Sequence, residues 1–162
     1  MGDSAFAGCS TLTNATIANG VTNIAYGMFL DCTKLTGVFF QGNAPTVVGD
    51  EDYDGPVFYG DNSVTVYYLP GTTGWSNTYQ GVPTVLWNPQ IQASGANFGM
   101  KNNQFGFNIT GTPNIPIVVQ ASTGLPSSVW TSLTNVLLTN GSYYFSEPLQ
   151  ACPARYYRIS PP

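Results

Sequence analysis

The residues best suited to chemistry are carboxylates between positions 50 and 61. Asp50-x-Asp52-x-Asp54-Gly55 places three carboxylates at alternate positions before a glycine, and Asp61 falls at the twelfth position of the same segment. Ca²⁺ binds six or more oxygen ligands, and alternate side chains of a tight loop converge on one point. The spacing therefore indicates a calcium loop. The final Asp in place of a bidentate Glu, and the lack of predicted flanking helices, favour the other interpretation, a solvated acidic insertion.

Catalytic groups are scarce, because the sequence contains no histidine. This excludes Ser–His and Cys–His nucleophile pairs and removes the most common zinc ligand. Glu147 is the one acid after residue 61, so paired carboxylates for glycoside hydrolysis are confined to the acidic segment. No glycine-rich phosphate loop is present. We therefore predict a protein that is not an enzyme and requires no cofactor, with Ca²⁺ as the one candidate ion.

Three cysteines have an open redox state. Cys9 and Cys32 have similar sequence surroundings, so in a repeat structure they stack about one strand spacing, ~5 Å, from each other. That spacing permits a disulfide, but inward-facing repeat cysteines behave as small buried hydrophobes, and we favour free thiols. Cys152 is the third cysteine and has no pattern that assigns it a role.

Trp75 is the aromatic residue with a candidate binding role. It follows a Gly/Thr-rich turn, where an exposed indole face stacks on a sugar ring. The alternative is packing against the protein, to which we assign Trp87 and Trp130 because they lie in apolar strand contexts. The sequence leaves both interpretations of Trp75 open.

A repeat positions the two cysteines. Phe6, Cys9 and Leu12 recur as Phe29, Cys32 and Leu35, always at the same offset, and Ala15 and Ile17 recur as Val38 and Phe40 at that offset too. The period lies in the range of one leucine-rich repeat, and the alternation predicts a short strand with one buried face. These residues, with Ile24, resemble the BspA-like leucine-rich repeat family over residues 2–45. The resemblance implies a solenoid with adhesive surface functions.

The rest of the first half is expected to close this solenoid. After Pro45 the period breaks, and we predict an acidic loop over residues 48–60 followed by strands at 64–69 and 83–87. Residues 46–87 then form a cap, and residues 1–87 form one leucine-rich repeat domain. The first repeat lacks a neighbour in this sequence, so we expect the chain to associate through this open edge or to fray over residues 1–20.

Residues 88–162 form a second compositional block. Apolar alternation predicts strands around Phe105/Phe107/Ile109, Ile117/Val119/Ala121, Val136/Leu138, Tyr143/Phe145 and Tyr157/Ile159. The Asn140-Gly141 dipeptide predicts a two-residue hairpin with a type I′ turn. These elements favour a small antiparallel β-sandwich. The Ala154 to Ile159 strand resembles the end of C-terminal modules in secreted bacterial proteins.

Charge excludes several partners. Residues 1–87 hold seven acids and Lys34, whereas residues 88–162 hold Glu147 and three basic residues. Four basic residues in the whole chain cannot neutralise several phosphates, so nucleic-acid binding and docking to anionic lipid are not expected. No apolar run is long enough for a transmembrane helix. No signal peptide is recognisable, so we interpret the sequence as a fragment of an extracellular or cell-surface protein.

These observations favour a non-catalytic extracellular protein that recognises a protein or matrix ligand through leucine-rich repeats. One alternative is a structural subunit that self-assembles through the open N-terminal repeat edge. Another is a carbohydrate-binding module of a secreted enzyme, with Trp75 as its stacking residue. The fold expected in each case is mainly β: a short leucine-rich-repeat solenoid with a C-terminal cap, then a small antiparallel β-sandwich.

Overall fold

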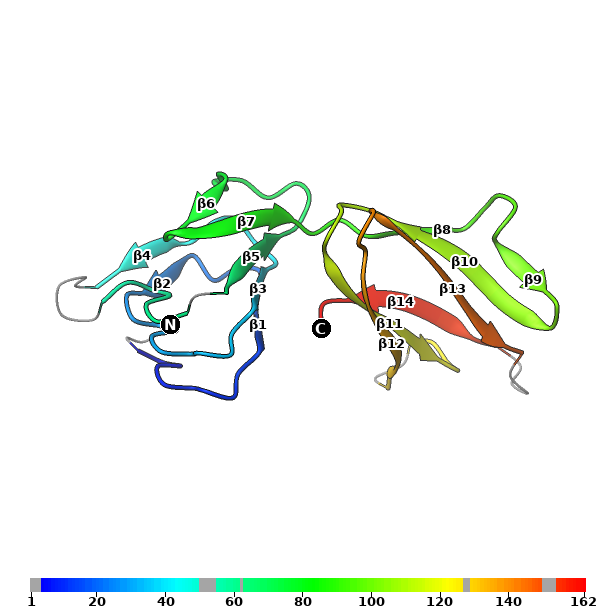
Figure 1. The fold of residues 1–162 in the computed structure, drawn as a ribbon, viewed down its shortest axis with the longest axis horizontal. Helices are drawn as coiled ribbons and strands as arrows, with labels where there is room; N and C mark the ends of the chain where they lie inside the picture. Colours follow the sequence, from blue (N-terminus) through cyan, green and yellow to red (C-terminus); the bar gives the residue numbers. More distant parts are fainter. Residues whose placement is uncertain (1–3, 50–54, 62, 127–128, 150–153) are drawn as a thin grey trace. The chain divides into compact units, whose positions relative to one another are not determined.

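The computed structural model describes residues 4–49, 55–61, 63–126, 129–149 and 154–162. In this part of the chain it contains fourteen β-strands and no helix (Figure 1), which confirms the prediction of a mainly β protein. Its contacts divide the chain into two compact units, Met1–Trp87 and Asn88–Pro162. Strands dominate because Thr, Val, Phe and Tyr suit a pleated, half-buried surface.

The first unit contains seven short strands. They are β1 (Asn14–Ile17), β2 (Asn23–Ala25), β3 (Gly37–Phe40), β4 (Thr46–Val48), β5 (Thr65–Tyr68), β6 (Thr78–Tyr79) and β7 (Val82–Leu86). β1, β3, β5 and β7 pair in parallel in that order, and β6 pairs antiparallel to β7 at the far edge. β2 and β4 form a separate parallel pair.

The strand register follows the sequence period. Asn14 lies opposite Gly37, and Asn23 lies opposite Thr46, so both pairs are separated by one full repeat. Val38 and Phe40 point into one apolar core together with Ile17. Leu35 is buried in this core and Leu12 packs against it. The alternation at these positions therefore marks the face of the sheet that the core covers.

Three similar turns lie against the same core, and we call them the turn ladder: Phe6–Cys9, Phe29–Cys32 and Phe58–Asp61. The Phe6 and Phe29 rings stack with centroids 5.4 Å apart, and the Phe29 and Phe58 rings stack at 5.7 Å. In each turn the fourth residue donates its backbone N–H to the carbonyl of the phenylalanine, at 3.1, 3.1 and 3.2 Å. Equivalent residues thus occupy equivalent places on three levels.

Backbone hydrogen bonds join the levels of the turn ladder. Phe6 donates its N–H to the Met28 carbonyl at 2.9 Å, and Phe29 donates to the Val57 carbonyl at 3.0 Å. Two residues further on, Gly8 donates to Leu30, and Asp31 donates to the Tyr59 carbonyl. The backbone polar groups of these buried turns are therefore satisfied by the neighbouring level.

Residues 48–60 differ from our expectation of one acidic loop, and 46–87 are more than a cap. Val48 ends β4, and residues 55–61 contain the third turn of the ladder, in which Val57 and Phe58 are buried. The comparison at a fixed period missed this turn because Phe58 follows Phe29 at a longer separation than Phe29 follows Phe6. The extra residues fall before Gly55, where the structure describes Gly49 and Gly55 but not the segment between them.

The second unit also contains seven strands. They are β8 (Gln90–Gln92), β9 (Gly99–Lys101), β10 (Gln104–Thr110), β11 (Pro116–Ser122), β12 (Thr131–Leu137), β13 (Ser142–Pro148) and β14 (Tyr156–Ser160). β13, β10 and β8 form one antiparallel sheet, with β9 also on β10, and β12, β11 and β14 form another. Aromatic contacts between Phe105 or Phe107 on β10 and Tyr157 on β14 join the two sheets.

The predicted hairpin at Asn140-Gly141 is wrong. β12 and β13, the strands on either side, pair with β11 and β10 respectively and belong to different sheets. Gly141 has a positive φ of 71°, whereas Asn140 is not in the left-handed region that a type I′ turn requires. Glycine is needed here because a Cβ on Gly141 would approach the Gly111 carbonyl oxygen to 2.7 Å.

The tight hairpin lies instead between β9 and β10. Asn102 and Asn103 both have positive φ, 49° and 60°, and the flanking residues Lys101 and Gln104 are paired. Two consecutive left-handed residues are the type I′ pattern, and Asn tolerates that conformation better than most residues. Sequence reasoning passed over this pair because it lacks the glycine that usually marks such a turn.

Candidate functional site

Asp61 is the buried acidic group of the first unit. It occupies the ladder position held by Cys9 and Cys32 in the other two turns. The side chain of Cys32 donates its S–H to the Phe6 carbonyl, 3.0 Å away, on the level above. Asp61 is 6% exposed, and neither of its carboxylate oxygens has a hydrogen-bond partner of normal geometry in the structure. An ionised carboxylate in this place is electrostatically unfavourable.

The surroundings of Asp61 raise its pKa to about 6. Burial is the largest cause, and the negative charge of Asp31 adds to it, while the backbone N–H of Cys32 partly offsets the rise. Asp31 itself adopts a positive φ of 56°, at the place where the neighbouring turns have Gly8 and Gly60. Gly60 needs its missing Cβ, because that atom would lie 2.3 Å from an Asp31 carboxylate oxygen.

The expected calcium ligands are described only in part. Asp50, Asp52 and Asp54 lie outside the described residues, and Asp61 lies inside them. The structure brings Asp61 close to Asp31, a residue that the sequence analysis did not connect with the acidic segment. Among the described residues, no three side chains of the usual metal-ligating types come together. The described part of the chain therefore supplies a pair of carboxylates for a cation.

The two described cysteines are free thiols in different environments. Cys32 is fully buried, and burial raises the pKa of its thiol. Cys9 is exposed, because the first turn of the ladder has no covering level among the described residues. Cys152 lies outside the described residues. The buried thiol is thus held in its protonated, poorly nucleophilic form.

Trp75 is half-buried and packs within an aromatic cluster. Its ring stacks on Tyr68 with centroids 5.4 Å apart and contacts Phe40 and Tyr79 at 5.1 and 5.3 Å. The indole N–H donates to the Thr72 hydroxyl at 3.0 Å. One ring face is therefore covered by Tyr68, and the indole donor is already used.

Trp130 lies just before β12 and carries a charge on its ring. The guanidinium carbon of Arg158 sits 4.3 Å from the ring centroid, a cation–π geometry. Arg158 also donates from Nε to the Gln120 side chain at 2.7 Å. This contact lies on the surface of the β12–β11–β14 sheet, and Trp130 was expected to be a packing residue.

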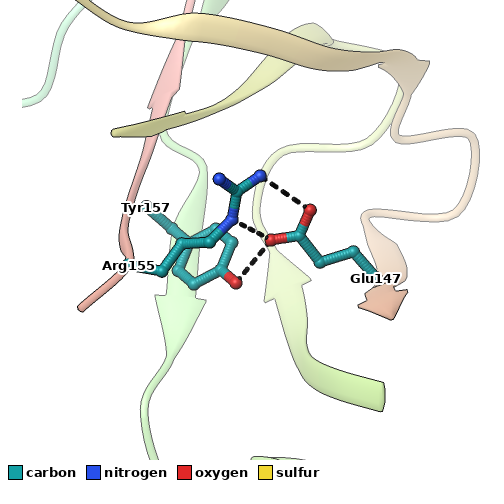
Figure 2. A network of polar contacts seen from close by, with 3 residues as sticks. All are labelled: Glu147, Arg155 and Tyr157. Atoms are coloured by element: carbon teal, nitrogen blue, oxygen red, sulfur yellow. Dashed lines mark hydrogen bonds and ion pairs between the residues drawn. The ribbon is translucent and has the colours of Figure 1, made fainter. Parts of the chain in front are cut away.

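Glu147 is paired rather than isolated in the second unit. Figure 2 shows its carboxylate facing the Arg155 guanidinium and the Tyr157 hydroxyl. Arg155 bonds both carboxylate oxygens through Nε and Nη2, the second at 2.9 Å, and Tyr157 donates to one of them at 2.7 Å. Sequence reasoning missed this network, because its partners are separated by residues 149–154 and come from two different sheets.

The protonation states in this network are fixed by its geometry. Burial alone would raise the pKa of Glu147, but the hydrogen bonds from Arg155 and Tyr157 outweigh burial, and the pKa is lowered. The pKa of Tyr157 rises to about 12, chiefly through burial and then through its bond to Glu147. Glu147 is consequently a stable anion and Tyr157 a stable donor. This arrangement suits a structural clamp and not proton transfer near neutral pH.

A small hollow lies beside the clamp. It has a volume of about 130 Å³ and is lined by Ala121, Ser122, Thr123, Val129, Thr131 and Arg155. A water molecule takes up roughly 30 Å³ of liquid, so the hollow has room for a few waters. The Ser122 hydroxyl is already used, donating to the Gly124 carbonyl.

Comparison with protein-family models, with curated proteins and with solved structures finds no match to this chain. No helix long and apolar enough to cross a membrane is found among the described residues.

Proposed function

We propose that this chain is a non-catalytic extracellular recognition protein whose first unit is a leucine-rich-repeat solenoid of the BspA-like kind. The observation that supports this most directly is the turn ladder, in which Phe6, Phe29 and Phe58 stack at a nearly constant spacing. Parallel strands whose register matches the sequence period accompany it. Such stacks build regular extended surfaces, which repeat proteins use for binding.

The surface chemistry of the repeats suits an uncharged partner surface. Ser10 and Thr33 are exposed at equivalent positions, and so are Thr13 and Thr36. Thr36 donates its hydroxyl to the Thr13 carbonyl at 3.1 Å, which holds the two levels together. Hydroxyl side chains at a regular spacing offer donors and acceptors without a strong field, as a protein or matrix ligand requires. The lack of histidine in the chain favours binding over catalysis.

In this proposal the second unit is a β-sandwich that serves as a spacer or anchor. The Glu147–Arg155–Tyr157 clamp ties the end of β13 to β14, which stabilises the two-sheet arrangement against separation. A mechanical role of this kind needs no catalytic or ligand-binding group. Its location outside the cell remains an inference from composition, in which charged residues make up 7%.

The binding proposal is tested on a panel of immobilised extracellular matrix proteins. We expect the purified chain to bind at least one of them, and we expect Thr33→Glu, on the exposed repeat surface, to weaken binding severalfold. Ser132→Glu, at an exposed position of β12 in the second unit, is the matched control and should bind normally. Equal loss in both variants, or no binding across the panel, would contradict recognition through the repeats.

Calcium binding is the second function that an observation favours. Asp61 is a buried carboxylate whose oxygens have no hydrogen-bond partner of normal geometry, and Asp31 lies close enough to affect its pKa. A cation near this pair would remove an unfavourable charge, and the acidic segment beginning at Asp50 precedes it in sequence.

Thermal unfolding at pH 7.5 with and without millimolar Ca²⁺ tests this function. We expect Ca²⁺ to raise the melting temperature by several degrees and Mg²⁺ to have a smaller effect, because ligand binding to the native state adds to stability. The increase should disappear in Asp61→Asn. An unchanged melting temperature at millimolar Ca²⁺ eliminates the site.

A further inference from the structure

The two edges of the five-stranded sheet differ in how they are protected. β6 closes one edge with two residues, Thr78 and Tyr79, paired antiparallel to β7. A very short edge strand is a common way to prevent pairing with other chains. β1 forms the other edge and, among the described residues, pairs on one side only, with β3. A strand from another molecule can therefore add to this sheet at β1 and not at β6.

The surface around β1 is apolar and lacks charge. Phe6 is 36% exposed, whereas Phe29 and Phe58, its equivalents in the ladder, are 0% and 6% exposed. Leu12 and Ala15 are partly buried on the same level and pack against the core. No charged residue occurs from Ser4 to Leu30. Edge strands are usually protected by charges, Pro or bulges, and β1 carries none of these.

We propose that β1 is the interface of a two-fold symmetric dimer of this chain, in which β1 of one copy pairs antiparallel with β1 of the other. A second copy fits this edge because an uncharged strand meets its own copy without electrostatic repulsion. Two-fold symmetry brings two identical edges together in opposite directions, which gives antiparallel pairing. Exposed apolar surface around Phe6 becomes buried on both sides of the interface.

The asymmetry of the edges decides the form of the assembly. Open-ended filaments need two different complementary surfaces, one at each end of the stack. β6 blocks the second surface, so association through β1 uses up the only free edge of this sheet among the described strands and stops at two copies. The assembly is thus a closed dimer. It does not depend on recognition of a matrix ligand, so the two proposals stand or fall separately.

Sedimentation velocity over a wide concentration range tests the dimer. The wild-type chain should shift from monomer to a species of twice the monomer mass and no further. Thr16→Lys places a charge at an exposed position of β1 and should abolish the dimer. Thr78→Lys, the same substitution at the exposed position of β6, should leave it unchanged. Circular dichroism of both variants verifies that each remains folded.

Hydrogen exchange gives a second measurement that does not rely on a variant. Amides of residues 14–17 should become more protected as the concentration of the wild-type chain rises, whereas those of residues 78–79 should not change. A strictly monomeric chain, growth to species larger than a dimer, or a dimer that Thr78→Lys disrupts and Thr16→Lys does not, would overturn the proposal. Monomeric chains that acquire protection at β1 only with a different protein would overturn it too and assign the edge to that partner.

Discussion

At the scale of single residues, Asp61 shows how one substitution in a repeated position changes the chemistry. Cys9 and Cys32 are small and apolar, and Cys32 meets its hydrogen-bonding need by donating to a carbonyl on the adjacent level. A carboxylate at the same place donates nothing unless it is protonated. Its pKa of about 6, against an ordinary value of 3.8, expresses this cost.

The raised pKa of Asp61 gives a stability profile of definite sign. Because the folded state holds the proton more tightly than the unfolded state, Asp61 favours folding most below about pH 4, and this advantage is lost as the pH rises to about 6. Asp61→Cys should therefore stabilise the first unit at pH 7.5 by roughly 2 kcal/mol and flatten this part of the profile. Urea unfolding at several pH values in EDTA measures both effects.

A conservative variant serves as the control for this prediction. Asp31→Asn removes the neighbouring charge and keeps a residue that tolerates positive φ. Since the charge of Asp31 is the second cause of the shift, this variant should lower the pKa of Asp61 without abolishing the pH dependence. A pH profile of wild type without a slope between pH 4 and 6 would show that Asp61 is hydrated or otherwise satisfied in solution.

At the scale of secondary-structure elements, β13 and β14 are held by one charged network although they belong to different sheets. Glu147 lies near the end of β13, Arg155 immediately before β14, and Tyr157 within β14. The side chains of Arg155 and Glu147 are 22% and 12% exposed, so solvent screens the pair only partly. A bidentate pair of this kind stabilises more than an ordinary surface salt bridge.

Glu147→Gln should destabilise the second unit by about 1–3 kcal/mol, because it leaves the Arg155 charge partly buried without its partner. The lowered pKa of Glu147 means that its contribution is present above its ordinary pKa and is lost as the pH falls through the lower, folded value. Chemical denaturation at pH 7 and at acidic pH measures this. Arg158→Gln, on an exposed arginine, is the control and should cost less; equal costs would show that the clamp adds nothing.

At the scale of the whole molecule, charge is distributed unevenly along the sequence and within the first unit. Seven of the eight acids precede residue 88, yet none lies between Ser4 and Leu30. Apart from Asp3, the carboxylates of the first unit therefore belong to the second and third turns of the ladder or to the sequence between them. The described residues of the level with the free strand edge are neutral. This distribution permits two copies to meet at β1 without repulsion between acidic surfaces.

Several features could be predicted from local sequence. The low content of charged residues and the abundance of Thr, Val and aromatic residues indicated a β protein, and the spacing of Phe, Cys and Leu located the first two turns of the ladder. Alternating apolar residues located β10, β11, β13 and β14. These predictions succeeded because strand formation and side-chain alternation depend on residues close together in sequence.

Pairing and burial required the tertiary structure. The third turn was missed because an insertion lengthens its separation from the second, and the Asn140-Gly141 hairpin was wrong because β12 and β13 find better partners in separate sheets. The pKa of Asp61 and the Glu147–Arg155–Tyr157 clamp depend on groups brought together from distant positions. Sequence sets the period and the local conformation, whereas desolvation and long-range contacts decide which polar groups are strained, paired or exposed.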